Sequence, residues 1–262
     1  MSVKLFWRFL IVSGLVLAIL FGIYVYRFSK PRLVFCDVGQ GTGVLAAMGE
    51  FQFVYDTGPK NGKFLSCLSR NMPFWDKKIE VVVISHWDSD HSGGLDEVID
   101  YYKIDSLYSN QNSEQYSYSK ILALNDSLKT SWMEFWVVWT DDKSEPNYGS
   151  VVAVLTIGEL KSLLMGDVPI EVEEELLWSR VKRDKNLAEK LKDVDVILVG
   201  HHGSKFSTSK EWLEFIKAKQ AIISVGDNKF GHPSKEVLDR LAELKMVVKR
   251  TDAEGDVILT DF

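Results

Sequence analysis

The chain has 262 residues, a formal net charge of −6 at pH 7, and an ordinary globular composition with 46% hydrophobic and 26% charged residues. A negative net charge argues against a general nucleic-acid coat protein, whose affinity comes from many cationic contacts with phosphate. After the first thirty residues, the remaining length suits one sizeable domain, and nothing in the composition requires two.

The N-terminal segment is far more apolar than the rest of the chain. Leu10 to Tyr26 is a run of seventeen residues without a charge, preceded by Lys4 and Arg8. Seventeen residues is near the lower limit for crossing a bilayer. The absence of a small-x-small cleavage pattern favours an uncleaved anchor over a signal peptide, and apolarity on every face disfavours a core helix. We predict a single-pass membrane anchor over residues 1–30.

Residues 31–262 alternate short β-branched runs with turns and helical segments. Strands are expected within residues 32–48, 51–59, 79–86, 133–139, 150–158, 160–167, 193–203 and 219–226, and residues 245–262 have the pattern of a closing hairpin. Helices are expected within residues 67–75, 92–102 and 171–192. The pattern does not place the strand and loop expected in residues 103–131. Because the polar motifs lie at strand ends, we predict a two-sheet sandwich with flanking helices.

Two cysteines are too few for a disulfide framework. Cys36 lies in the apolar run LVFC, so we expect a small buried hydrophobic residue there. Neither Cys36 nor Cys67 has the spacing of a metal ligand relative to another cysteine. The cysteines therefore leave the redox compartment undecided.

All five histidines fall within three short motifs. His86 and His91 belong to HWDSDH, His201 and His202 to HHG, and His232 to GHP. The first motif follows a β-branched run, and the carboxyl ends of strands are where open α/β sheets usually carry their sites. This distribution indicates that the chain uses imidazole for chemistry.

The HWDSDH motif provides two imidazoles and two carboxylates within six residues. One ion cannot use all four groups from so tight a turn, so we predict two adjacent ions, with His86 and Asp88 on one and Asp90 and His91 on the other. The alternative is a turn that is rich in Asp because Asp favours turns. Two histidines and the following Gly-Gly pair disfavour that alternative.

Several motifs together resemble a known family. SHWDSDHSGGL resembles the signature turn of the metallo-β-lactamase fold. DVGQG at 37–41, MGD at 165–167, HHGSKFS at 201–207 and GHPS at 231–234 are similar to the soluble domain of the ComEC/Rec2 competence proteins, which handle incoming DNA. The resemblance extends from about Arg32 to Leu259. It implies an αββα sandwich with a metal site at one edge, formed by residues 31–262.

The resemblance also implies roles for further residues. Asp167 would bridge the two ions, and His202, or His201 as the alternative, would complete the second one. His201 or Lys205 could meet or protonate an oxygen of the substrate, and Asp90 is expected to be essential for catalysis.

A further group of residues is expected to support the metal ligands from behind. Asp37 and Gln40, on the Gly-rich turn, would orient the ligands. His232 is either a ligand or such a supporting group, and we prefer the second assignment. For Asp37 and Gln40, simple turn chemistry is the alternative, and for Lys205 it is an exposed loop lysine.

Two departures from the family pattern affect the first ion. Asp88 stands where many metallo-β-lactamase-fold enzymes carry His. No histidine lies between His91 and His201, where the pattern has another ligand, and Asn147 or Ser150 occupies that region. Only His86, Asp88 and the shared Asp167 would hold the first ion. Such an oxygen-rich site should bind weakly and accept Mn²⁺ or Mg²⁺ as well as Zn²⁺.

These features predict a membrane-anchored hydrolase that cleaves phosphodiester bonds, above all those of DNA, through a hydroxide bridging two divalent metal ions. Residues 201–250 carry ten Lys or Arg against six Asp or Glu, a local charge of +4 (10 − 6) that could favour DNA. The alternatives are a hydrolase of another cell-envelope phosphodiester or amide, and a non-catalytic tethered binding module. DNA-uptake or other membrane proteins are the expected partners. The basic residues flanking the anchor are nearly balanced, and the resemblance favours an extracytoplasmic catalytic domain.

Overall fold

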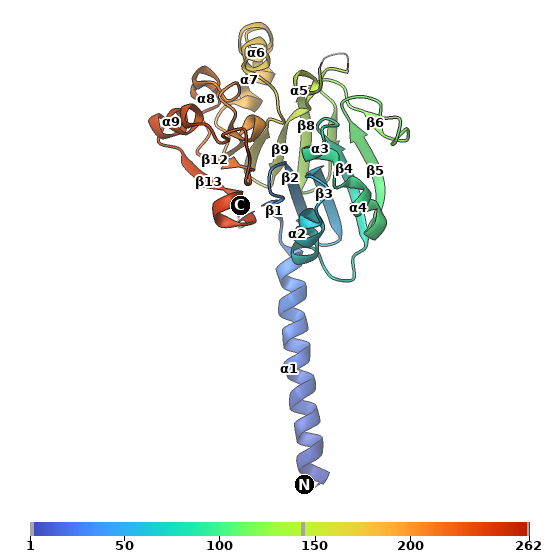
Figure 1. Cartoon of the computed structure of the whole chain (residues 1–262). Coiled ribbons are helices and arrows are strands. Elements are labelled where there is room, and N and C mark those ends of the chain that lie inside the picture. Colours follow the sequence, from blue (N-terminus) through green and yellow to red (C-terminus); the bar gives the residue numbers. More distant parts are fainter. Residues whose placement is uncertain (1–2, 143–144, 261) are drawn as a thin grey trace.

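A computed structural model of the chain describes residues 3–142, 145–260 and 262, and shows one long helix projecting from an α/β domain (Figure 1). The helix is α1 (Val3–Ser29). Its segment Leu10–Ser29 has a mean hydropathy of 2.1, and the most apolar part of this segment is not buried against the domain. So exposed an apolar helix is a candidate membrane span. The first two residues of the predicted anchor lie outside the described residues.

The first sheet is built mainly from the N-terminal half of the chain. Its strands, in spatial order, are β14 (Val257–Leu259), β1 (Arg32–Phe35), β2 (Gly43–Met48), β3 (Phe51–Thr57), β4 (Lys78–Ile84), β5 (Lys103–Ser109) and β6 (Lys120–Ile121). From β3 to β6 neighbouring strands pair in parallel, so β3 and β4 end at the same edge of the sheet.

The second sheet is built from the rest of the chain. Its order is β13 (Val247–Arg250), β12 (Gln220–Ile223), β11 (Val196–Leu198), β10 (Leu160–Leu164), β9 (Val152–Ile157), β8 (Met133–Trp139) and β7 (Ser127–Lys129). From β10 to β13 the strands pair in parallel. The carboxyl ends of β10, β11 and β12 therefore meet at one edge as well.

Helices cover the outer face of each sheet. The helices on the first sheet are α2 (Lys63–Asn71) and α4 (Leu95–Tyr101). Those on the second are α6 (Ile170–Glu175), a π-helical segment (Leu176–Val181), α7 (Lys185–Leu191), α8 (Lys210–Ile216) and α9 (Lys235–Glu243). Short helices complete the chain: α3 (Ser89–Ser92), α5 (Pro146–Gly149), a 3-10 turn (Gly200–Gly203) and α10 (Thr251–Glu254). The arrangement confirms the predicted αββα sandwich.

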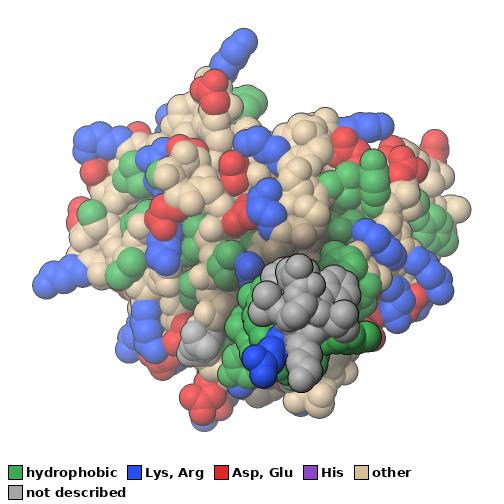
Figure 2. All heavy atoms as spheres, turned by 90° about the horizontal axis from the view of Figure 1, so that it is seen from below, with side chains coloured by type: hydrophobic (Ala, Val, Ile, Leu, Met, Phe, Trp, Pro, Cys, Tyr) green, Lys and Arg blue, Asp and Glu red, His purple; other side chains and the backbone are tan. Residues whose placement is uncertain are grey.

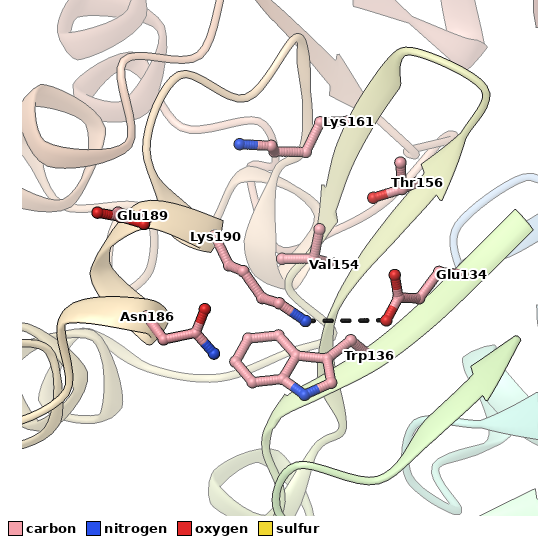
Figure 3. A pocket seen from close by; sticks show the side chains of 8 residues that line it. All are labelled: Glu134, Trp136, Val154, Thr156, Lys161, Asn186, Glu189 and Lys190. Atoms are coloured by element: carbon pink, nitrogen blue, oxygen red, sulfur yellow. Dashed lines mark ion pairs between the residues drawn. The ribbon is translucent and has the colours of Figure 1, made fainter.

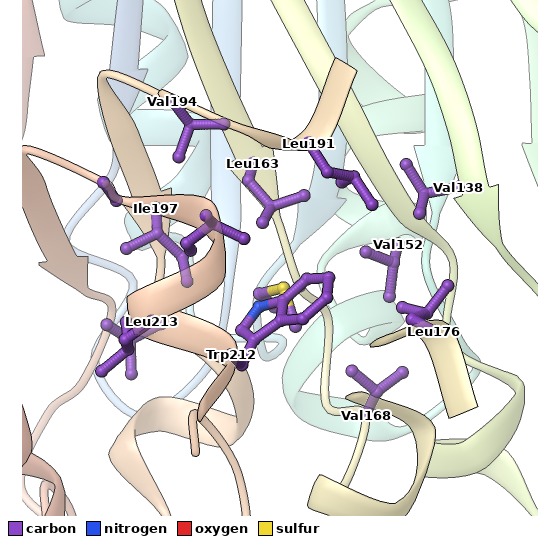
Figure 4. Packing of buried hydrophobic residues seen from close by; sticks show 14 of the residues in the cluster. Val138, Val152, Leu163, Val168, Leu176, Leu191, Val194, Ile197, Trp212 and Leu213 are labelled. Atoms are coloured by element: carbon purple, nitrogen blue, oxygen red, sulfur yellow. The ribbon is translucent and has the colours of Figure 1, made fainter. Parts of the chain in front are cut away.

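Three apolar clusters hold these layers together. One lies between the sheets, where the rings of Phe53 and Tyr55 in the first sheet each contact Phe135 in the second. A second packs α2 and α4 onto the first sheet. In the third, the fully buried Trp212 of α8 lies among aliphatic side chains from the second sheet and its helices (Figure 4). Each sheet is thus packed on both faces. This packing holds the strands, and therefore the loops at their ends, in fixed positions.

The C-terminal segment does not form the predicted hairpin. β13 pairs in parallel with β12, whereas β14 pairs antiparallel with β1 of the other sheet. Between them α10 and Gly255, whose φ is 74°, redirect the chain. The hairpin prediction is wrong: both strands exist, but they pair with strands elsewhere in the sequence and not with each other. The segment instead ties the two sheets together.

The two cysteines form a disulfide that the sequence analysis missed. Cys36, just after β1, is bonded to Cys67 of α2 with a Cα–Cα distance of 5.9 Å. Both residues are fully buried, as expected for Cys36. The bond holds α2 against the first sheet, and its two partners are 31 residues apart in sequence, so spacing alone gave no sign of it.

Aromatic side chains connect the domain to the end of α1. Tyr24 of α1 lies 5.9 Å from the ring of Phe74 and 5.6 Å from that of Trp75, and its hydroxyl accepts a hydrogen bond from the Phe74 backbone N–H. Figure 2 views this face along α1, with hydrophobic side chains next to the helix and Lys and Arg side chains on the surrounding surface. Such rings suit the interface between a bilayer and water.

Candidate metal centre

The chemistry-bearing motifs converge because the strands that carry them end at one edge of the sandwich. HWDSDH follows β4, Asp167 follows β10, and the His201–His202 pair follows β11. Four of these residues form a compact group: one donor atom each from Asp90, His91, Asp167 and His202 lie within 4.8 Å of one another.

The distances within the group are short. His91 Nε2 lies 3.1 Å from Asp167 Oδ1, and His202 Nε2 lies 3.2 Å from Asp90 Oδ2 and 3.8 Å from Asp167 Oδ2. We call Asp90, His91 and His202 the inner half of the centre, and His86 and Asp88 the outer half. Asp167 contacts the two inner imidazoles and interacts electrostatically with His86.

The buried donor atoms of the inner half suit a metal ion. Among the described residues, His86 Nε2, His91 Nε2 and Asp167 Oδ1 are buried and make no hydrogen bond, although the last two lie 3.1 Å apart. Such atoms are costly unless something binds them. Two imidazoles with two carboxylates form a donor set that Zn²⁺ and Mn²⁺ accept. The residues present therefore fit a divalent ion.

Each histidine of the inner half is held in the tautomer that a metal requires. His202 Nδ1 donates to the carbonyl oxygen of Ser224 at 2.8 Å, and His91 Nδ1 donates to Asp56 Oδ2 at 2.7 Å. A carbonyl oxygen and an ionised carboxylate can only accept, so both Nδ1 atoms carry the proton. Each Nε2 is then the ring atom that faces the centre, where a metal ion would replace any proton that it carries.

Asp56 is a supporting residue that the sequence analysis missed. Its side chain is fully buried and accepts hydrogen bonds from the Ser85 backbone N–H and hydroxyl, both at 2.7 Å. Since the Ser85 proton is used on Asp56, its oxygen accepts from His86 Nδ1 at 3.0 Å. One carboxylate thus orients His91 directly and His86 through Ser85. The signal in the sequence is an Asp near the end of the strand expected within residues 51–59.

The outer half is looser. His86 Nε2 and Asp88 Oδ2 are 3.6 Å apart, and the Asp88 side chain is 48% exposed. Ser150, one of the two residues named for the missing histidine, is buried with its hydroxyl 3.1 Å from His86 Nδ1. A serine oxygen there supports His86 and adds no imidazole to the centre. The outer half is therefore oxygen-rich, as the sequence indicates.

Electrostatic coupling within the centre is strong. Burial lowers the pKa of His91, but Asp167 and Asp56 outweigh it and raise that pKa well above its ordinary value. Conversely, burial raises the pKa of Asp167, but His91 and His202 lower it well below the usual range. Asp167 is therefore ionised at neutral pH, the form in which a carboxylate binds a cation.

His201 and His232 lie beside the compact group. His201 Nε2 is 3.7 Å from Asp167 Oδ2, its side chain is about a third exposed, and its ring is 5.7 Å from that of His232. Burial lowers the pKa of each of these two histidines. His201 and His202 both have a positive φ, 48° and 54°, a strained conformation that tends to occur at functional sites. Of this pair, the structure places His202 within the compact group.

The remaining predicted residues lie further out. The exposed side chain of Lys205 extends over the ring of Phe206, with Nζ 5.1 Å from the ring centre. Asp37 accepts from Lys63 Nζ at 3.2 Å, and Gln40 Oε1 accepts from the Gly226 N–H at 3.4 Å. None of these three contacts involves the side chain of a candidate metal ligand.

The Gly-rich turn supports the centre through its backbone. The Thr42 N–H donates to the Asp90 carbonyl at 3.0 Å, and the Gly41 carbonyl accepts from the Ser224 hydroxyl at 2.8 Å. A Cβ on Gly41 would lie 2.3 Å from the Asp90 oxygen, so only glycine fits there.

The loop that carries His201 and His202 is held from two sides. Glu173 accepts the backbone N–H groups of Thr208 and Ser209 at 2.6 and 2.7 Å, and Arg240 donates to the carbonyl oxygens of residues 205, 207 and 208. Burial raises the pKa of Glu173 to about 7. The loop is thus fixed without help from the metal ligands.

A surface pocket of about 210 Å³ lies elsewhere, between the second sheet and α7 (Figure 3). Lys190 extends across it, 3.8 Å from Glu134 and over the ring of Trp136. None of the residues lining it belongs to the histidine motifs. Because the pocket lies away from these motifs, we assign it no part in the chemistry.

Comparison with known proteins agrees with this geometry. No family model matches the chain. It is 25% identical over 286 residues to ComE operon protein 3 of Bacillus subtilis, covering 95% of this chain and 36% of that protein. It is 28% identical over 246 residues to Recombination protein 2 of Haemophilus influenzae, covering 90% and 30%. The chain therefore spans about a third of the length of these relatives.

Among solved structures, the metallo-β-lactamase fold protein YhfI from Bacillus subtilis superposes with a TM-score of 0.60 and 11% identity, covering 88% of this chain and all of that one. At this identity the likeness concerns the fold. The comparisons confirm the predicted resemblance: the chain has a metallo-β-lactamase fold and is similar to the ComEC/Rec2 competence proteins.

Proposed function

We propose that the protein is a membrane-tethered, metal-dependent hydrolase of phosphodiester bonds with DNA as its substrate, and that residues 31–262 form the catalytic domain. The observation that carries this proposal is the compact group of Asp90, His91, Asp167 and His202 beside an accessible outer half. Two divalent ions would be held, one by the inner half and one by the outer half, with Asp167 shared. Zn²⁺ or Mn²⁺ suits the inner half, and Mg²⁺ is also compatible with the outer one.

When bound, such ions supply Lewis-acid stabilisation of charge on phosphoryl oxygens and activate water. The chain's own residues do the rest. Asp56 and Ser224 keep the imidazoles of the inner half oriented, so that little reorganisation is needed when substrate arrives. His201 is partly exposed with Nε2 directed at Asp167, where an imidazole N–H can donate to the oxygen of the leaving group. Lys205 is placed to meet a more distant phosphate.

DNA is favoured as the substrate for two reasons. The relatives of this chain include one named Recombination protein 2 and one named Competence protein ComA. The segment 201–250, which includes His201, His202 and His232, carries a local charge of +4 from ten basic and six acidic residues (10 − 6).

The placement of the domain outside the cytoplasm is also part of this proposal. The exposed apolar helix α1 would anchor the chain in a membrane. The buried disulfide between Cys36 and Cys67 supports an oxidising compartment, because disulfides persist there and are rare in reducing ones. DNA-uptake or other membrane proteins would be the partners.

Hydrolysis by the full chain, purified in detergent, tests the proposal. Bis-p-nitrophenyl phosphate, single-stranded DNA and double-stranded DNA would each be offered with Mn²⁺, Zn²⁺ or Mg²⁺. Asp90→Ala should abolish cleavage, whereas Asp105→Ala, which removes a surface carboxylate paired with Lys78, should not. Metal binding without cleavage of any phosphodiester would contradict phosphodiesterase activity and leave the amide alternative. Absence of both metal binding and cleavage would leave the non-catalytic, tethered binding module as the remaining alternative.

A further inference from the structure

Two large aromatic side chains are exposed next to the candidate metal centre. Phe206 is 65% exposed in the loop that follows the His201–His202 pair, and Phe230 is 73% exposed in the loop that precedes His232. Exposing two phenylalanines to water is unfavourable, and neither loop belongs to the face from which α1 leaves the domain (Figure 1). Their position calls for a ligand with a flat apolar surface.

A line of rings connects Phe230 to the centre. The Phe230 and His232 rings are stacked, with centroids 5.8 Å apart and planes 23° apart. His232 is 5.7 Å from His201, whose Nε2 is 3.7 Å from Asp167. One face of Phe230 is thus occupied by His232, and its large exposure leaves room for a second flat ring.

Both loops are held rigidly by their own hydrogen bonds. The Asn228 side chain accepts from the backbone N–H groups of Phe230 and His232 at 3.0 Å and donates to the His232 carbonyl at 2.8 Å. On the other side, the Phe206 carbonyl accepts from the Ile170 N–H at 2.9 Å, and Arg240 binds the flanking carbonyls. The exposure of the two rings is therefore built into the fold, and little ordering is needed on binding.

Each exposed phenylalanine directly follows an exposed lysine. The pairs are Lys205–Phe206 and Lys229–Phe230, and Lys205 Nζ lies 5.1 Å above the Phe206 ring. A ring for stacking next to a cation for a phosphate is the combination that binds single-stranded nucleic acid.

We propose that the Lys205–Phe206 and Lys229–Phe230 pairs form a binding site for single-stranded DNA, in which the phenylalanines stack on bases flanking the scissile phosphate. In a duplex the base faces are already stacked on one another, so the site selects single strands. Stacking tolerates any base, so binding should show little sequence preference. Because it names the form of the substrate, this site rests on the proposed function.

The test compares binding of two oligonucleotides by the full chain in detergent, followed by fluorescence anisotropy. One is a hydrolysis-resistant oligothymidylate, and the other is an abasic strand of equal length and charge. Wild type should bind the oligothymidylate more tightly, by at least about fivefold for each stacked base. The double variant Phe206→Ala/Phe230→Ala should lose this preference. Phe230→Tyr in the Phe206-intact chain should keep it.

The matched control is Phe74→Ala, which removes a similarly exposed ring (69%) beside α1 and should leave the preference unchanged. Equal binding of the two strands by wild type, or an undiminished preference in the double variant, would overturn the stacking site.

Hydrolysis of bis-p-nitrophenyl phosphate by wild type, measured in parallel, separates the two proposals. A base preference lost in the double variant supports the stacking site even if wild type cleaves no phosphodiester, which would contradict the proposed function alone.

Discussion

The inner and outer halves of the candidate metal centre are built from adjacent residues but differ in burial and support. In the inner half, His91 and His202 are buried and each Nδ1 has one acceptor, so both Nε2 atoms are aimed. In the outer half, His86 is also buried and its Nδ1 lies beside the hydroxyls of Ser85 and Ser150, but Asp88 is 48% exposed and no third imidazole is present there among the described residues. A preorganised donor set binds a metal more tightly than one that must be ordered first.

The difference indicates a division of labour. The inner half suits a permanently held ion, whereas the exposed Asp88 makes the outer half accessible to substrate. Asp167 couples the halves because it is ionised, contacts the inner imidazoles of His91 and His202, and interacts electrostatically with His86 of the outer half.

The largest expected effect comes from removing one imidazole from each half in turn. His202→Ala should weaken tight zinc binding by more than about a hundredfold, because a buried ligand and its aimed lone pair are both lost. His86→Ala should leave the tight ion in place and remove the weak one. Zinc content after dialysis against a weak chelator measures both. Equal losses of zinc in the two variants would contradict the difference between the inner and the outer half.

Asp56→Asn should weaken metal binding in both halves, by roughly 10–100-fold. The substitution keeps the shape of the side chain but removes the charge that accepts from His91 directly and from His86 through Ser85. Isothermal titration with Zn²⁺ would measure the change. Asp76→Asn, which alters another buried aspartate far from the histidines, is the control and should have no effect. A loss confined to one half would show that Asp56 does not serve both.

Glu173 should make stability depend on pH, through the loop that carries the inner half. Burial raises its pKa from 4.5 to about 7, so between these values the folded state holds a proton that the unfolded state has released. Its contribution to stability is complete below pH 4.5 and is lost as the pH rises through 7, by about 1–3 kcal/mol. Denaturant unfolding of Glu173→Gln should show a flatter pH profile over this window. If the free energy of unfolding of Glu173→Gln depends on pH as steeply as that of wild type, Glu173 is not the group responsible.

The smallest expected effect is a gain in zinc preference at the outer half. Asp88→His replaces an exposed oxygen ligand by imidazole, so the weak site should prefer Zn²⁺ over Mn²⁺ by several-fold more than wild type does. Competition between the two metals measures this preference. No change would mean that Asp88 does not touch an ion.

The sequence was most informative where chemistry and local pattern coincide. The buried strand before HWDSDH and the confinement of histidines to three motifs predicted a metal site at strand ends, and the resemblance added Asp167 and His202 to it. Properties that depend on distant partners were not predictable. Asp56 is 35 residues from His91, β14 pairs with β1 across the whole chain, and Cys36 meets Cys67 only after α2 packs on the first sheet.

Stepwise metal binding to the full chain tests the central claim most directly. Calorimetric titration with Zn²⁺, combined with metal analysis after dialysis, should show one tight ion and one weak ion per chain, with only the weak site accepting Mn²⁺ or Mg²⁺ readily. Two equally tight zinc ions, or no bound metal at all, would contradict the division into an inner and an outer half.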